Sequence, residues 1–268
     1  MLVILPPSET KRAGGVGQLD PHALSHARPL GNARERVREA LEALCVDPDE
    51  AARVLKLGVK ARGEIGLNQA LGTSGTLPAI ERYTGVLYDA LDVLSLGSAA
   101  REWIGRHVAV QSALFGLLAA DDLIPAYRLS AGSRLPELGA SLKSVWQQAH
   151  LEGIWNSDTW VLDLRSKDYA ALAPFPAELG AALAVAQRTA DGQVRALNHF
   201  NKAAKGDLVR RLARSGAEIS SAGEFADWAR EQGLEVHVEA GSGALTLVTT
   251  LGAAPLGQAS ASGARSAG

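Results

Sequence analysis

The chain has 268 residues, with 27 Lys plus Arg against 29 Asp plus Glu, 47% hydrophobic residues and one cysteine. A chain of this length buries enough surface to need no stabilising metal or disulfide, and the single Cys45 excludes a disulfide framework and any multi-cysteine zinc or iron–sulfur site. The formal net charge of −2 excludes a generally basic nucleic-acid coat, although it says nothing about a local basic patch.

The N-terminal segment predicts a short buried strand followed by a loop. Residues 2–5 are aliphatic, and Pro6 and Pro7 stop the run. The segment has no basic stretch and is not expected to be a signal peptide, and no apolar run approaches the roughly 18 residues of a membrane span. Together with the cysteine usage, this indicates a cytoplasmic protein with no membrane partner.

Capping residues and apolar spacing predict the helices. Asn32 is a good N-cap for the first helix, and Asp47 caps the second, with Pro48 at its first position and Gly58 as its stop. Ser221 and Glu224 form a capping box before the last helix. The predicted helices span residues 33–44, 48–57, 98–106, 141–150, 201–214 and 221–230.

Apolar runs and turn residues predict a mixed sheet. Strands are expected over 159–164, 182–188, 194–200, 234–238 and 245–247. Asp191 and Gly192 favour a tight hairpin turn, and a second hairpin closes the sheet near the C-terminus. We therefore predict an α+β (mixed α/β) fold. Residues 1–250 would form a single compact domain with surrounding helices, and 251–268 a disordered glycine-rich tail.

The strongest local charge lies over residues 195–214, with six Lys and Arg against one Asp. On the predicted helix Lys202 and Lys205 share a face with Asn201 beside them, and Arg210 lies a turn or two beyond. Such a surface can neutralise phosphates without reading sequence. An ordinary solvated helix face is the alternative.

A second candidate is the turn Leu57–Gly58–Val59, flanked by Lys56, Lys60 and Arg62. An apolar–glycine–apolar turn between helices is typical of helix-hairpin-helix elements, in which backbone N–H groups hold a phosphate. Ordinary termination of a helix at a glycine explains the same pattern.

Three loops carry further candidates. Ser8, Glu9, Thr10 and Lys11 follow the first strand, where binding residues are common. Tyr127, Arg128 and Arg134 suit stacking or anion recognition, and Ser166 and Lys167 follow a central strand, where open α/β sheets bind ligands. Ordinary surface turns are the alternative for each. His22 and His26 lack a third ligand nearby, so we expect no metal and no cofactor.

Taken together, these segments resemble the peroxide stress protein YaaA family. The matches are collinear and extend to about Thr250, which makes them more specific than any single motif. They comprise residues 1–11 (MLVILPPSETK), 82–85 with Tyr88, 113–118, 121–129, 132–135, Trp146, 163–169 and 199–206. The segment around Glu9 departs from the pattern, because many relatives have Lys there; Lys11 carries a charge two positions later.

The resemblance implies a bacterial protein of the hydrogen peroxide response that limits free intracellular iron and so protects DNA. It also implies a helix-hairpin-helix element and a basic cleft for duplex nucleic acid, which strengthens the expectation for Gly58, Lys202 and Lys205. The candidate nucleic-acid contacts are Lys11, Lys56, Lys60, Arg62, Arg128, Arg134, Lys167, Lys202, Lys205 and Arg210. The candidate polar residues of the cleft are Ser8, Glu9, Thr10, Tyr127, Ser166 and Asn201.

The leading hypothesis is a monomeric, non-enzymatic protein that binds duplex DNA of any sequence. The alternative is an enzyme acting on a nucleotide or a nucleic-acid base in the same cleft. A buried lysine or carboxylate with a strongly shifted pKa beside a closed pocket would favour the enzyme, whereas an open basic groove would favour binding. Direct iron sequestration ranks last, because the sequence offers only scattered acids and one histidine pair.

Overall fold

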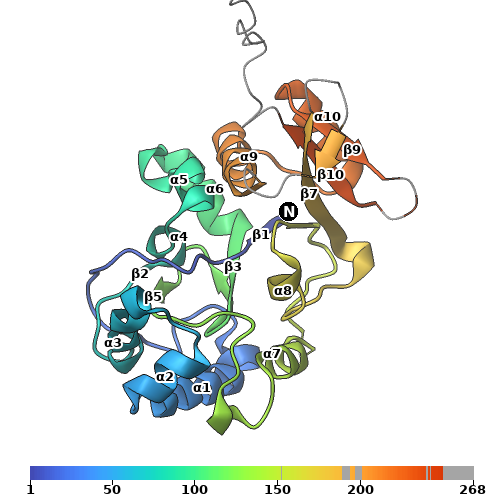
Figure 1. The fold of residues 1–268 in the computed structure, drawn as a ribbon. Helices are drawn as coiled ribbons and strands as arrows, with labels where there is room; N and C mark the ends of the chain where they lie inside the picture. Colours follow the sequence, from blue (N-terminus) through green and yellow to red (C-terminus); the bar gives the residue numbers. More distant parts are fainter. Residues whose placement is uncertain (152, 189–193, 197–200, 240, 242, 250–268) are drawn as a thin grey trace, which may run out of the picture.

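The computed structural model describes the chain except for residues 152, 189–193, 197–200, 240, 242 and 250–268. Figure 1 shows a twisted sheet with helices packed around it. The order of the strands in the sheet is β4-β3-β1-β6-β7-β10-β9, with β8 beside β7. The predicted mixed α/β class is confirmed, and the predicted tail lies outside the described residues.

The sheet combines a parallel centre with antiparallel strands. Parallel pairs join β1 to β3, β1 to β6, β6 to β7 and β7 to β10, and antiparallel pairs attach β4, β8 and β9. The bounds are β1 Leu2–Leu5, β3 Val108–Ser112, β4 Gly116–Ala119, β6 Val161–Asp163, β7 Gly180–Arg188, β8 Val194–Ala196, β9 Glu235–Val238 and β10 Leu245–Thr249. A separate short ladder pairs β2 (Leu77–Pro78) with β5 (Leu123–Ile124). The strand pairing of both predicted hairpins is confirmed, and the Asp191–Gly192 turn lies outside the described residues.

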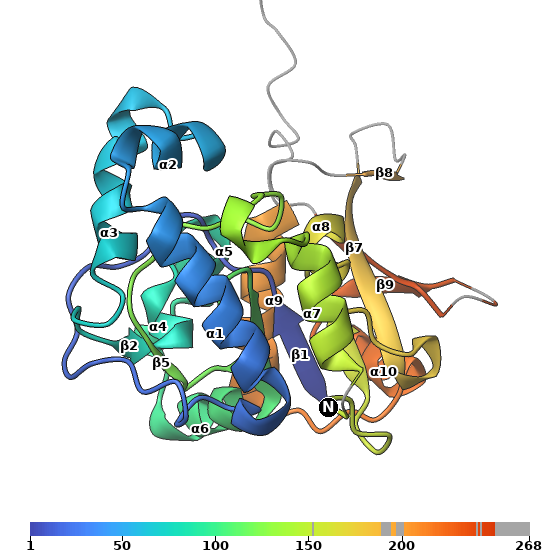
Figure 2. The same cartoon turned by 90° about the horizontal axis from the view of Figure 1, so that it is seen from below.

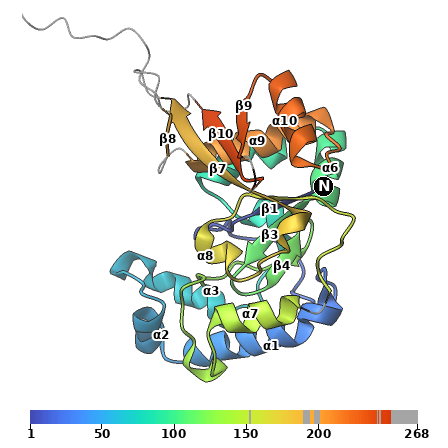
Figure 3. The ribbon, with the colours of Figure 1, turned by 90° about the vertical axis from the view of Figure 1, so that its right-hand side faces the viewer.

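Helices cover both faces of this sheet. In Figures 2 and 3, α1 (Ala27–Leu44) and α7 (Leu142–His150) lie on one face. On the other lie α6 (Ser98–His107), α9 (Asn201–Ser215) and α10 (Ala222–Glu231). The other helices are α2 (Pro48–Val54), α3 (Ile65–Gln69), α4 (Ala79–Arg82), α5 (Val86–Leu91) and α8 (Lys167–Ala170), with 3-10 turns at Val59–Glu64, Val93–Ser95, Pro136–Leu138 and Ala177–Leu179. Because both faces are covered, Val3, Ile4 and Leu5 of β1 are fully buried within one continuous hydrophobic core.

The arrangement of β1 and β6 defines a ligand position. These two parallel strands are neighbours, but the chain leaves β1 toward β3 and leaves β6 toward β7, on the opposite side. In open α/β sheets, ligands bind outside the carboxyl ends of strands at such a point. In Figures 2 and 3, β1 runs from the N-terminus toward the side of the molecule that carries α2, α8 and β8.

The first helix starts earlier than Asn32 predicts. It begins at Ala27, and Asn32 is an exposed residue inside it. Pro29 lies in the first turn, where its missing N–H costs no helical hydrogen bond. The helix is held from its buried face, because Arg34 donates to the carbonyl oxygens of Phe115 (2.8 Å) and Leu117 (2.9 Å).

The segment around Gly58 differs from the predicted helix end. Helix α2 stops at Val54, and Lys56, not Gly58, takes the left-handed conformation with φ 55°. Gly58 is extended, and a 3-10 helix, Val59–Glu64, follows it. Val59 is 85% exposed, whereas Leu57 is buried. The helix-hairpin-helix element stays a prediction, with a 3-10 turn where its second helix was expected.

Candidate functional site

Buried side chains fix the loop that follows β1. The guanidinium of Arg82 is enclosed in the protein and donates to the carbonyl oxygens of Arg12 and Gly14. The hydroxyl of Tyr88 donates to the carbonyl oxygen of Pro6 at 2.8 Å. These contacts order the loop at the carboxyl end of β1, where the sheet topology predicts a site.

Lys11 lies over an aromatic floor in this loop. Its Nζ donates to the carbonyl oxygens of Ser8 (3.1 Å) and Glu9 (3.3 Å) and stands 4.0 Å from the centroid of the Tyr127 ring. The Tyr127 hydroxyl is hydrogen-bonded to Ser112 Oγ at 2.7 Å and to the Tyr83 hydroxyl at 2.8 Å. Because these partners are buried, they hold the ring under the amine. We call Ser8, Thr10, Lys11, Tyr83, Tyr127 and Arg128 the strand-end cluster.

The surroundings of Lys11 disfavour its charged form. Burial, followed by the nearby positive charge of Arg128, lowers the pKa of Lys11 to about 7, and Glu64 and Glu9 oppose this effect. Both carboxylates pair with Arg128, at 3.0 Å for Glu9 and 3.3 Å for Glu64. About half of the Lys11 side chains are therefore neutral at pH 7.

We expect Lys11 to react before the exposed Lys60 with an acylating reagent at pH 7. An ordinary lysine, with a pKa near 10.5, is then only about 0.03% neutral, and only the neutral amine is a nucleophile. Raising the pH to 9 increases the neutral fraction of an ordinary lysine about a hundredfold but that of Lys11 only about twofold, so the preference should shrink. Peptide mass spectrometry on briefly labelled protein measures both rates. Equal rates at pH 7 would contradict the lowered pKa.

The end of β6 contains a buried ion pair. Asp163 Oδ1 accepts from Arg165 Nε at 2.8 Å, and Arg165 also donates to the carbonyl oxygen of Ala173 at 2.9 Å. Beside them, Lys205 Nζ donates to the carbonyl oxygen of Leu164 at 2.9 Å. Burial lowers the pKa of Lys205, and the charge of Asp163 opposes this shift.

Lys202 and Lys205 do not form one solvated basic face. Lys202 is exposed, but Lys205 is only 7% exposed because its side chain reaches inward to β6. Arg210 is also directed inward, donating to the carbonyl oxygens of Leu91 and Asp92, both at 2.9 Å. These two cations attach α9 to its neighbours and do not line one exposed basic row with Lys202, and phosphate contact by any of the three stays a prediction.

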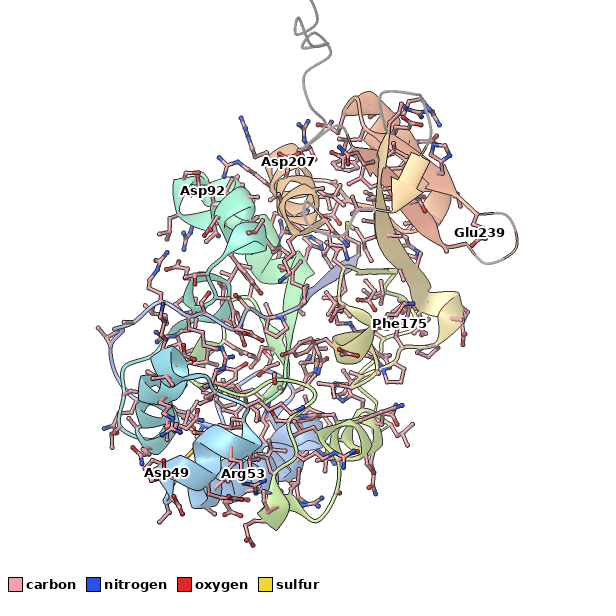
Figure 4. The ribbon with its side chains drawn as sticks, in the orientation of Figure 1. Asp49, Arg53, Asp92, Phe175, Asp207 and Glu239 are labelled. Atoms are coloured by element: carbon pink, nitrogen blue, oxygen red, sulfur yellow. The ribbon has the colours of Figure 1, made fainter. Side chains whose placement is uncertain are left out.

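Some of the other predicted cations form ion pairs within the protein, and others do not. Arg62 pairs at 3.0 Å with Asp49, a residue in the first turn of α2 that is labelled in Figure 4. Arg128 pairs with Glu9 and Glu64. Among the predicted contact residues, the exposed cations that make no ion pair within the described chain are Lys56, Lys60, Arg134, Lys167 and Lys202. These side chains are free to contact an external anion.

The structure brings part of the predicted site together. Among the predicted residues, Ser8, Thr10, Lys11, Tyr127 and Arg128 meet at the end of β1. Ser166 and Lys167 follow β6 at the same edge of the sheet, and Asn201 begins α9. Sequence reasoning did not select Tyr83, Ser112 or Glu64 as site residues. Tyr83 lies in the matched motif at 82–85, which could have indicated it, whereas Ser112 and Glu64 carry no sequence signal.

A cavity of about 860 Å³ lies elsewhere, between α7 and the segment before β7. Its walls include His150, Trp155 and Phe175, the last of which is labelled in Figure 4. None of the predicted site residues lines it. Within the described residues, no three His, Cys, Asp or Glu side chains are grouped to hold a metal ion. No helix in that part of the chain is long and apolar enough to cross a bilayer.

Fold and site together define a mixed α/β protein with a cationic polar site at the carboxyl ends of two parallel strands. Residues 1–239 match the model of a family described as peroxide stress protein YaaA. The chain belongs to this peroxide stress family.

Relatives cover almost the same length. An UPF0246 protein of Corynebacterium efficiens is 41% identical over 253 residues, which span 92% of this chain and all of the relative. An UPF0246 protein of Streptomyces coelicolor is 43% identical over 244 residues, which span 90% of this chain and 93% of the relative. The predicted family is therefore confirmed.

Proposed function

We propose that this peroxide stress protein binds duplex DNA of any sequence and so limits the damage that free intracellular iron causes to DNA. The supporting observation is that unpaired exposed cations surround the strand-end cluster. Lys167 follows β6, and Lys202 lies in the first turn of α9, close to Lys205, whose Nζ contacts Leu164 O at the end of β6. Lys60 belongs to the 3-10 turn whose last residue, Glu64, pairs with Arg128 of the cluster.

Duplex DNA is the partner that suits this arrangement. The cations come from separate elements spread around the carboxyl edge of the sheet, and a regularly charged polymer can contact all of them at once. Each phosphate contact releases counterions, so binding is independent of sequence and weakens as salt rises. In this function the protein is linked to iron because it shields the bound DNA from iron-driven oxidation.

The test is a salt titration of duplex binding by fluorescence anisotropy, applied to Lys60→Gln/Lys202→Gln. Removing two phosphate contacts is expected to lower affinity and to flatten the slope of log K against log salt by about 2, at about 0.9 per contact. Exposed charges contribute little to the free energy of unfolding, so the melting temperature of the double variant should equal that of the wild type.

A matched control removes two cations from the opposite edge. Arg106 and Arg214 are exposed and lie in the last turns of α6 and α9; Arg214 is about 18 Å along the helix from Lys202. Arg106→Gln/Arg214→Gln changes net charge by the same amount and should leave the slope nearly unchanged. Equal slopes for both double variants and the wild type would refute the placement of the DNA at the strand-end cluster.

A second candidate function is an enzyme acting on a nucleotide or nucleic-acid base at the same position. One observation favours it: Lys11, at the centre of the cluster, has a pKa of about 7. Perturbed lysines of this kind gather at catalytic sites, where a neutral amine acts as base or nucleophile.

A further inference from the structure

The cavity between α7 and the segment before β7 has a preformed aromatic wall. Its rings belong to His150, Trp155 and Phe175, and the centroid of the Trp155 ring is 6.0 Å from that of each of the other two. Trp155 Nε1 donates to the carbonyl oxygen of Pro174 at 3.1 Å. His150 Nδ1 donates to the carbonyl oxygen of Trp146 at 2.7 Å. Because these bonds fix two of the rings, a planar group can pack against the wall without a prior rearrangement.

The lining of this cavity attracts an anion. Among the described residues that line it, Lys143 is the only Lys, Arg, Asp or Glu, and its side chain is exposed. Burial lowers the pKa of His150 to about 4, although its hydrogen bond to Trp146 opposes the shift, so the imidazole is neutral at pH 7. The described lining therefore combines one positive charge with aromatic and neutral polar groups, which suits an aromatic ligand that carries an acidic group.

The positive charge and the aromatic wall lie at opposite ends of α7. Lys143 is in the first turn and His150 is the last residue, so their Cα atoms are about 10 Å apart along the helix. Between them Ser144 and Gln148 line the cavity one turn apart, and their side chains make no hydrogen bond with another described residue. A ligand that reaches both ends therefore has its anion separated from its ring by a polar spacer. A nucleotide has this order of groups, because a ribose joins its base to its phosphate.

We propose that this cavity is a binding site for a free nucleotide, with the base against Trp155 and Phe175 and the phosphate at Lys143. The volume of about 860 Å³ is within the range of small-molecule sites, roughly 300–1,000 Å³. An intact duplex does not suit the site, because its bases are stacked inside the helix and cannot reach the rings. No residue of the strand-end cluster lines the cavity, so this proposal does not depend on the proposed DNA contacts.

Isothermal titration calorimetry of the full chain with AMP tests the proposal. One saturable site is expected, and adenosine, which lacks the phosphate, and ribose 5-phosphate, which lacks the base, should each bind at least tenfold more weakly. Phe175→Leu keeps an apolar side chain but removes a ring, so AMP and adenosine should both lose about fivefold or more in affinity. Lys143→Gln should weaken AMP about tenfold and leave adenosine unchanged, because only AMP has a phosphate. A melting curve for each variant checks that it folds.

Controls separate this site from the strand-end cluster. Lys202→Gln should leave AMP affinity unchanged, and Phe175→Leu should leave duplex affinity and its salt dependence unchanged. No AMP binding to the folded wild type, or the same AMP affinity in the wild type, Phe175→Leu and Lys143→Gln, overturns the nucleotide site and leaves DNA binding in place. AMP binding that is lost in Lys202→Gln but kept in Lys143→Gln overturns it as well, since the nucleotide then binds at the strand-end cluster.

Discussion

An Arg165→Met substitution is expected to lower the free energy of unfolding by about 3–5 kcal/mol, because it leaves the carboxylate of Asp163 buried without its partner. The Arg165 side chain is 0% exposed and that of Asp163 is 5% exposed, so water cannot replace the lost contacts. The nearby Lys205 donates to Leu164 O, and no direct hydrogen bond joins it to the carboxylate. In a chain of this length the melting temperature should fall on the order of 10 °C.

The double variant Asp163→Leu/Arg165→Met shows whether the loss comes from the unpaired charge. Replacing both partners removes the buried carboxylate, so the double variant should be more stable than Arg165→Met alone. Urea or thermal unfolding of the wild type, Arg165→Met, Asp163→Leu and the double variant measures the difference. A double variant as unstable as the sum of the two single substitutions would show that the hydrogen bond to Ala173 O, and not the charge pair, stabilises this segment.

Local sequence signals predicted the helices that depend on local contacts. Asp47 caps α2, Ser141 caps α7 and Ser221 caps α10, each accepting from backbone N–H groups within three residues along the chain. A side chain that satisfies the free N–H groups of a first turn acts over a few residues, so the pattern is visible in sequence. Here the predicted and observed starts agree closely.

The predictions from sequence failed where a side chain contacts a segment far away along the chain. Lys205 has the spacing of a solvated helix face, but the carbonyl oxygen of Leu164, about forty residues earlier, draws its side chain inward. Glu64 shows no motif, yet it meets Arg128 because the 3-10 turn packs beside that loop. Sequence placed Lys11 in a loop at a strand end, but its low pKa depends on burial and on the charge of Arg128, which only the fold brings to it.

A Gly206→Ala substitution is expected to destabilise the protein by about 3 kcal/mol, although alanine is the better helix former by about 1 kcal/mol. Gly206 lies inside α9 where the helix touches α5. A Cβ there would stand 2.1 Å from the carbonyl oxygen of Leu87 and 2.9 Å from Cβ of Ala90. A backbone oxygen cannot rotate away as a side chain can, so one helix must move from the other.

Gly223, in the first turn of α10, offers the matched control. A Cβ there would meet nothing closer than Ser221 Oγ at 3.8 Å, so Gly223→Ala is expected to be neutral or to stabilise by about 0.5–1 kcal/mol. If Gly206→Ala lowers the free energy of unfolding while Gly223→Ala leaves it unchanged or raises it, the loss at Gly206 comes from the close approach of α9 to α5. Helix propensity would favour alanine at both positions. Because α9 also carries Lys202 and Lys205, Gly206→Ala should lower duplex affinity in the anisotropy assay as well. A Gly206→Ala protein as stable as the wild type would contradict the tight packing of α9 that holds both lysines at the end of β6.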